Sequence, residues 1–191
     1  MRQLKDNLWV FWASTTAGTI DRNGFYLLAD DARLVINPPG IADEDVSTFQ
    51  HLGPPTHVVL TDADRHTGAA QFAERFGSRV WLPQSVAIDI PGAHRYSINE
   101  SLPAGLHAIS LPAPRDAGEV VLHDRGHSAL MLGASFAAVP PGKVGPGAEV
   151  GHAAHRQNLQ AVGEINFELL LPANGFTLHR EGRRAIASSL M

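Results

Sequence analysis

Three side chains that can bind a metal ion follow a short apolar segment. Asp62, Asp64 and His66 come directly after Val58 to Leu60, with one residue between successive members. At this spacing the three side chains share a face only if the backbone stays extended. Two carboxylates and one imidazole can hold Zn²⁺, Mn²⁺ or Fe²⁺, and water on such an ion can act as a nucleophile. The motif therefore suggests an open mononuclear metal site.

The same residues also have a purely structural interpretation. Asp62 and Asp64 can accept the free N–H groups at the start of the next helix, while Arg65 and His66 pair with these carboxylates. Short motifs seldom identify a functional site without structural context. We therefore favour the structural role and keep the metal site as the alternative.

The elements around the motif predict a βαβ unit. His57 to Leu60 reads as a buried strand, Thr67 to Phe76 has the apolar periodicity of a helix, and Arg79 to Leu82 reads as a second strand. The two strands should be parallel, which places the motif at the carboxyl end of the first strand. That edge is where α/β proteins commonly carry their sites.

Further strands and helices are predicted on both sides of this unit. Before it, the patterns indicate strands at Leu8 to Ala13, Phe25 to Ala29 and Arg33 to Ile36, and a helix from Asp43 to about His51. After it, they indicate strands at Leu106 to Leu111, Glu119 to His123, Ala129 to Leu132 and Phe167 to Leu171, and helices at about His152 to Val162 and Arg183 to Leu190.

This order of elements predicts an α/β (α+β) protein. We expect a four-layer αββα sandwich, in which two mixed β-sheets pack together and helices flank both outer faces. The 191 residues, 44% of them hydrophobic, suffice for one well-buried core, so we expect a single domain over residues 1–191. The run from Pro140 to Gly147 is rich in Pro and Gly and should be an exposed loop.

Composition excludes several function classes. The net charge of −4 and the dispersed Lys and Arg give no basic surface for nucleic acid. The absence of cysteine excludes disulfides, thiolate zinc sites and cysteine nucleophiles, and is compatible with a reducing compartment. No segment has the length and apolarity of a membrane span or signal peptide. We expect a cytoplasmic protein without nucleic-acid or membrane partners; the oligomeric state is left open.

Five segments together resemble the metallo-β-lactamase fold superfamily. Each keeps scaffold residues that this family uses around its metal ligands, and the resemblance spans nearly the whole chain. The segments are Leu34 to Gly40, Val58 to Gly68, Leu111 to Glu119, Ala129 to Ala134 and Leu170 to Gly175. The resemblance implies the αββα fold and, in typical members, a dinuclear zinc hydrolase.

Most ligand positions of the family carry other residues here. Asn37 replaces an Asp, Ala134 replaces the carboxylate that bridges two metals, and Asn174 replaces a ligand His. In the segment that normally carries another ligand His, only Asp116 remains as a donor.

The first metal-binding loop can be aligned with the family in two ways. In one, Asp62 and Asp64 take the positions of the first two His, His66 that of the Asp, and Thr67 that of the last His. In the other, which is one residue shorter, His66 takes the position of the last His. The sequence leaves both alignments open.

Two functions follow from the resemblance. The first is a metallo-β-lactamase-like protein that has lost dinuclear zinc hydrolysis and needs no cofactor; it acts as a binding or scaffold protein, or through unknown chemistry, with a small molecule as its ligand or substrate. The second is a mononuclear hydrolase of an ester, lactone or phosphoester, in which Asp62, Asp64 and His66, with Asp116, hold one Zn, Mn or Fe ion. Asn174 and Trp12 are further candidates for lining a pocket.

Overall fold

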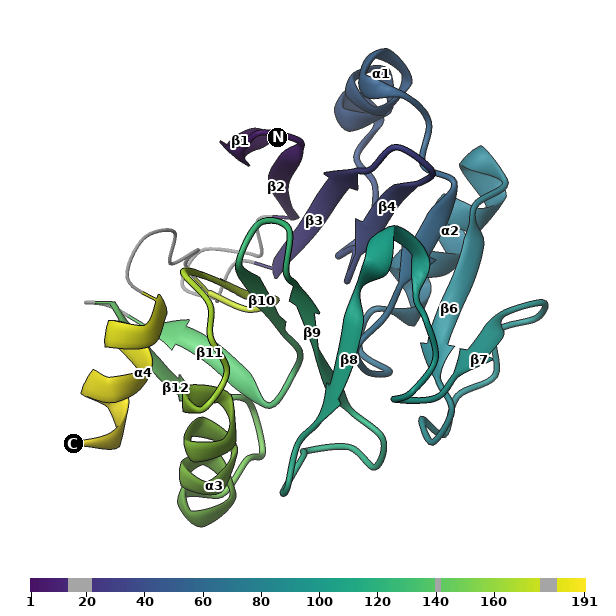
Figure 1. Ribbon diagram of the computed structural model, residues 1–191. Helices are drawn as coiled ribbons and strands as arrows, with labels where there is room; N and C mark the ends of the chain where they lie inside the picture. The colour runs from purple at the N-terminus through teal and green to yellow at the C-terminus, as the bar shows by residue number, and fades with distance from the viewer. Residues whose placement is uncertain (14–21, 140–141, 176–181) are drawn as a thin grey trace.

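Two large β-sheets form the centre of the protein (Figure 1). The computed structural model describes residues 1–13, 22–139, 142–175 and 182–191. Within these residues the first sheet has the strand order β1 (Arg2–Lys5), β2 (Leu8–Ala13), β3 (Arg22–Leu28), β4 (Arg33–Ile36), β5 (His57–Val59), β6 (Arg79–Pro83) and β7 (His94–Tyr96). The second has the order β13 (Leu169–Pro172), β10 (Ala129–Leu132), β9 (Val120–Asp124) and β8 (His107–Ser110).

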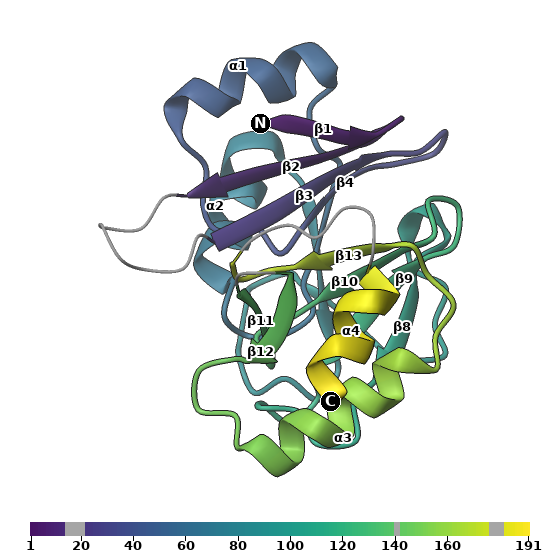
Figure 2. The ribbon, with the colours of Figure 1, turned by 90° about the vertical axis from the view of Figure 1, so that its left-hand side faces the viewer.

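Helices cover the outer faces of the two sheets. Figure 2 shows α1 (Asp43–Leu52) and α2 (His66–Phe76) beside the first sheet, and α3 (His152–Gly163) and α4 (Gly182–Leu190) beside the second. A short 3₁₀ turn, η1 (Pro103–Gly105), precedes β8. The predicted αββα sandwich is therefore confirmed. No helix in the described ranges is long and apolar enough to cross a membrane.

Alternating side chains explain why both sheets are buried on both faces. In β10, Met131 packs into the core between the sheets, whereas Leu130 and Leu132 pack into the core beneath α3 and α4. In β5, Val59 faces the core between the sheets and Val58 faces α1 and α2. Because successive side chains of a strand point to opposite faces, continuous apolar strands are needed in the middle layers.

The predicted βαβ unit positions the motif as expected. Strands β4, β5 and β6 are parallel, and residues 60–65 leave the carboxyl end of β5 before α2 begins at His66. A Cβ atom at Gly68 would collide with the carbonyl group of Pro38, so the first turn of α2 approaches the segment after β4 very closely. This close approach brings the ends of β4 and β5 together.

One sequence prediction needs correction, and three strands were not predicted. Lys143–Pro146 forms β12, which pairs antiparallel with β11 (Phe136–Val139), so this part of the predicted Pro/Gly loop is a strand. Pro140 and Pro141 lie outside the described residues. Because β11 and β12 form a sheet of only two strands, β12 is an edge strand, and edge strands tolerate proline and glycine. The short strands β1, β7 and β11 were not predicted, since three or four residues carry little periodicity.

Candidate functional site

Several strand ends converge at one edge of the sandwich and form the candidate site. Residues 61–65 follow β5, residues 133–135 follow β10, and Ala173 and Asn174 follow β13. The backbone N–H of Val120 in β9 donates to the carbonyl of Thr61, at 3.0 Å, and so ties the second sheet to the first. Side chains from both sheets are therefore held within contact distance here.

Asp62 is a buried carboxylate held by three hydrogen bonds. The backbone N–H of Asp64 donates to Oδ1 at 2.8 Å, and the backbone N–H of Ala134 donates to Oδ2 at 3.0 Å. The hydroxyl of Thr61 also donates to Oδ2, at 2.8 Å, and lies 3.1 Å from Oδ1 of Asn37. Burial raises the pKa of Asp62, against the opposing effect of these bonds. The carboxylate connects the two sheets and does not cap α2, which has no side-chain cap.

Arg115 lies between Asp64 and Asp116. Its guanidinium donates to both oxygens of Asp64, at 2.5 and 3.0 Å, and to one oxygen of Asp116, at 2.6 and 3.1 Å. Burial alone would raise the pKa of Asp64, but the hydrogen bonds and charge of Arg115 lower it. Bonding to two carboxylates raises the pKa of Arg115. A fixed cation thus binds two of the four predicted metal ligands.

Arg65 carries a second positive charge at the same edge, and it is 2% exposed. Its Nη2 donates to the carbonyl of Ala173 at 2.9 Å and to Oδ1 of Asn174 at 2.6 Å. Its Nε and Nη1 are buried and have no hydrogen-bond partner among the described residues. Burial lowers the pKa of Arg65, and the nearby charge of Arg22 adds to this effect. The predicted pairing of Arg65 with the motif's carboxylates is wrong, because its bonds go to the segment after β13.

His66 points away from the carboxylates. It is exposed, its Nδ1 lies 3.0 Å from the carbonyl oxygen of Ala63, and its Nε2 lies 3.3 Å from the hydroxyl of Thr67. Because α2 begins at His66, the backbone is no longer extended there, and the side chains fan apart. The predicted pairing of His66 with Asp62 or Asp64 is likewise wrong.

Glu119 is a buried carboxylate that the sequence analysis missed. The backbone N–H and the hydroxyl of Ser135 donate to its two oxygens, at 2.7 and 2.6 Å, and Ser135 Oγ accepts from the N–H of Arg115 at 2.7 Å. Burial raises the pKa of Glu119 to about 7, and the nearby carboxylate of Asp62 adds to the rise. A lone Glu before an apolar strand carries no sequence signal for this role.

Gly133 explains how two carboxylates fit side by side. A Cβ atom at this position would lie 2.5 Å from Oδ2 of Asp62 and 2.8 Å from Oε1 of Glu119. Any side chain there would therefore displace the carboxylates.

The two remaining candidates make no hydrogen bond to the carboxylates within the described residues. Trp12, in β2, is 44% exposed and pairs in register with Asn23 of β3. Within the described ranges, no hydrogen bond or ring contact joins Trp12 to another candidate. Asn174 binds Arg65. The bonded polar residues of this edge are together called the charged network: Asp62, Asp64, Arg65, Arg115, Asp116, Glu119, Ser135 and Asn174.

Comparison with solved structures defines the class of fold. The chain is similar to a metallo-β-lactamase from Pontibacter korlensis, at 13% identity and a TM-score of 0.78, covering 98% of this chain and 95% of that one. It is also similar to a metallo-β-lactamase from Erythrobacter litoralis (16%, TM-score 0.73, 98% and 92%) and to FIM-1 from Pseudomonas aeruginosa in its mono-zinc form (14%, TM-score 0.72, 98% and 92%). The chain therefore has the metallo-β-lactamase fold. No family model and no curated protein matches the sequence.

The residues at this edge do not fit the pair of zinc ions that the fold implies. Ala134 has no carboxylate to bridge two ions, and Oδ1 of Asn174 already accepts a hydrogen bond from Arg65. Two guanidinium groups add positive charge where cations would have to bind. Within the described part of the chain, no group of three or more His, Asp or Glu side chains is arranged to hold a metal ion.

Proposed function

We propose that this protein uses the metallo-β-lactamase fold without dinuclear zinc hydrolysis and acts by binding a small molecule. One observation carries the proposal: the guanidinium of Arg115 binds Asp64 and Asp116 together. A divalent ion that used these carboxylates would have to displace a cation that is already bonded to both.

The state of Asp62 supports the same conclusion. A carboxylate must be ionised to bind a metal, and burial raises the pKa of Asp62, which favours its neutral form. Its two oxygens already accept bonds from two backbone N–H groups and a hydroxyl. Binding a metal would cost these bonds, which connect the two sheets.

The alternative is the mononuclear hydrolase with Asp62, Asp64, His66 and Asp116 as ligands. It requires Arg115 to leave its ion pairs and the His66 ring to turn from the carbonyl of Ala63. These rearrangements make it the less favoured function.

Metal content tests the proposal directly. The protein is purified without chelator, incubated with Zn²⁺ or Mn²⁺, desalted and analysed beside Asp64→Ala/His66→Ala. We expect far less than one ion per chain in both proteins. Near-stoichiometric metal that the double variant loses would contradict the proposal and establish the mononuclear site.

Arg115→Ala provides a further comparison in the same assay. It removes the guanidinium that binds Asp64 and Asp116 and leaves both carboxylates available. If Arg115 opposes metal binding, this variant should retain more Zn²⁺ than the wild type. Equal and negligible retention would show that the remaining ligands are insufficient even without the guanidinium.

A cellular location can be proposed as well. We propose a cytoplasmic protein, with which the cysteine-free composition is compatible. Fractionation of the source cells, followed by detection of the chain, tests this location. Recovery outside the cytoplasmic fraction would contradict it.

A further inference from the structure

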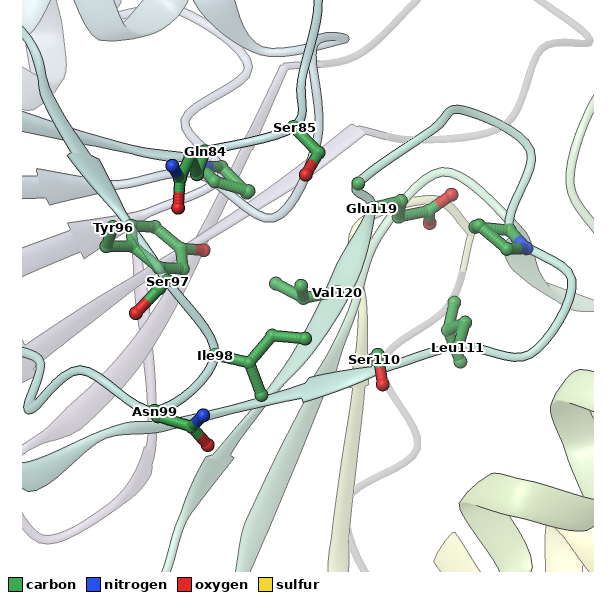
Figure 3. A pocket seen from close by; sticks show the side chains of 13 residues that line it. Gln84, Ser85, Tyr96, Ser97, Ile98, Asn99, Ser110, Leu111, Glu119 and Val120 are labelled. Carbon is green, nitrogen blue, oxygen red and sulfur yellow. The ribbon is translucent and has the colours of Figure 1, made fainter.

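A hollow of about 330 Å³ lies beside the charged network. Figure 3 shows Gln84, Ser85, Tyr96 and Ile98 on one side of it, and Ser110, Leu111, Glu119 and Val120 on the other. The first group lies at or just after the carboxyl ends of β6 and β7, and the second lies at the end of β8, at the start of β9, or one residue beyond these strands. The hollow thus opens between the two sheets, and its volume is at the small end of the range for ligand pockets.

Five polar side chains of the wall have no internal hydrogen-bond partner. In the described part of the protein, the side-chain amides and hydroxyls of this group make no hydrogen bond, and all five residues are exposed. They are Gln84, Ser85, Ser97, Asn99 and Ser110. Each of these groups can both donate and accept a hydrogen bond. No described residue uses this bonding capacity, which is therefore available to a ligand.

The wall offers no cation to a ligand. Its ionisable groups are Glu119 and Tyr96, and both are already bonded elsewhere. The Glu119 carboxylate is turned away from Tyr96 and Gln84 and accepts from Ser135 (Figure 3). The Tyr96 hydroxyl donates to the carbonyl of Leu60 at 2.6 Å, and burial raises its pKa well above the usual value. An anionic ligand would lose its hydration here without gaining an ion pair.

Apolar side chains complete the wall. Ile98 is 47% exposed, which is unusual for a side chain of this kind, and Leu111 and Val120 line the same hollow. The single aromatic residue of the wall, Tyr96, is 1% exposed and presents no ring face for stacking. The hollow therefore combines aliphatic surface with neutral donors and acceptors.

We infer that this hollow binds a neutral polyhydroxylated ring, such as a monosaccharide or a cyclitol. Such a molecule carries hydroxyl groups that match the free amides and hydroxyls, and a C–H face that matches Ile98 and Leu111. A nucleobase would lack a stacking partner, and an acid or a phosphate would lack a cation. The inference rests on the proposed function, because both hold that the chain acts by binding a small molecule. It is argued from the wall of the hollow and not from the predicted metal ligands.

Ligand-observed NMR tests the inference with named compounds. D-glucose, D-galactose, D-ribose and myo-inositol are compared with D-glucuronate, glucose 6-phosphate and adenosine, all with EDTA present. We expect at least one neutral polyol to bind, and its charged counterpart to bind at least about tenfold more weakly. If no neutral polyol binds, or if a charged compound or adenosine binds more tightly, the inference is overturned.

Two double variants locate the binding. Gln84→Ala/Asn99→Ala removes two amides of the wall, and should weaken binding by about tenfold or more. Gln3→Ala/Gln50→Ala removes two exposed amides from β1 and α1, and should leave binding unchanged, because neither residue lines the hollow and β1 is at the opposite edge of the first sheet from β7. Equal binding by both variants would overturn the inference. Because EDTA is present and no wall residue is a proposed metal ligand, this failure would be distinct from a positive metal assay.

Discussion

The charged network and the neighbouring hollow differ in the burial and hydrogen bonding of their polar groups. In the network, Asp62, Glu119 and Ser135 are buried, and each is bonded to other parts of the fold. In the hollow, residues such as Ser97 and Asn99 are exposed and have no internal partner in the described structure. Bonded polar groups at this edge stabilise the fold, whereas the unbonded ones remain available to a ligand.

Asp62→Ala should have the largest effect on the network. The change leaves the buried N–H groups of Asp64 and Ala134 without an acceptor, so the free energy of unfolding should fall by roughly 3 kcal/mol or more. Urea unfolding measures this loss. Asp62→Asn keeps an acceptor and should lose less. An Asp62→Ala protein as stable as wild type would show that this carboxylate is not part of the scaffold.

Glu119 should make the protein less stable as the pH rises. Its pKa in the folded state is raised to about 7, so its contribution to stability is full below its unfolded pKa and is lost as the pH rises through neutrality. From about pH 5 to about pH 8, we expect wild type to lose on the order of 2 kcal/mol more than Glu119→Gln. Urea unfolding at both pH values measures the difference. Parallel pH profiles would contradict this assignment.

Arg115→Ala should change how the free energy of unfolding depends on pH in the acidic range. Asp64 has a lowered pKa in the folded state, so its contribution is present above its unfolded pKa and is lost as the pH falls through the folded value. The variant should raise the pKa of Asp64, measured by carboxyl NMR, and cost about 1 kcal/mol at neutral pH because these groups are partly exposed. Arg156→Ala, on the exposed face of α3, is the control and should leave the pKa of Asp64 unchanged.

The smallest loss of stability is expected from Ser97→Ala, and it can be compared with the same change at Ser135. Ser97→Ala removes an unpartnered hydroxyl from the hollow and should change stability by less than about 0.5 kcal/mol. Ser135→Ala makes the same chemical change in the network, where the hydroxyl donates to Glu119 and accepts from Arg115, and should cost about 1 to 2 kcal/mol. Thermal unfolding compares them. Equal costs would remove the distinction between the two regions.

The layers of this fold were predictable from the sequence, because they follow local patterns. The apolar strand from His57 to Leu60, the periodic helix after it and the next strand fixed the direction of the βαβ unit. The scaffold residues around Ala134 and Asn174 further indicated the fold. The strand at Lys143–Pro146 was not predictable, because its pairing with β11, and not its Pro- and Gly-rich composition, determines its structure.

The contacts of the site were harder to predict, because they join residues far apart in the sequence. Asp64 and Arg115 are separated by 51 positions, and Arg65 and Asn174 by 109. Asp62, Asp64, His66 and Asp116 were chosen by residue type and spacing, which do not show that a guanidinium lies between two of them. The hollow gave no sequence signal at all, since single Ser, Asn and Gln residues are common on any surface.

The effect of Zn²⁺ on unfolding tests the central claim most directly. A metal that binds only the folded state raises the free energy of unfolding, by about 2.7 kcal/mol when its free concentration is about 100 times its dissociation constant. Urea unfolding is therefore compared in excess EDTA and in excess Zn²⁺. Our account predicts coincident curves, because Arg115 and the internal hydrogen bonds already satisfy the carboxylates. A zinc-dependent rise in stability that Asp64→Ala/His66→Ala abolishes would contradict it.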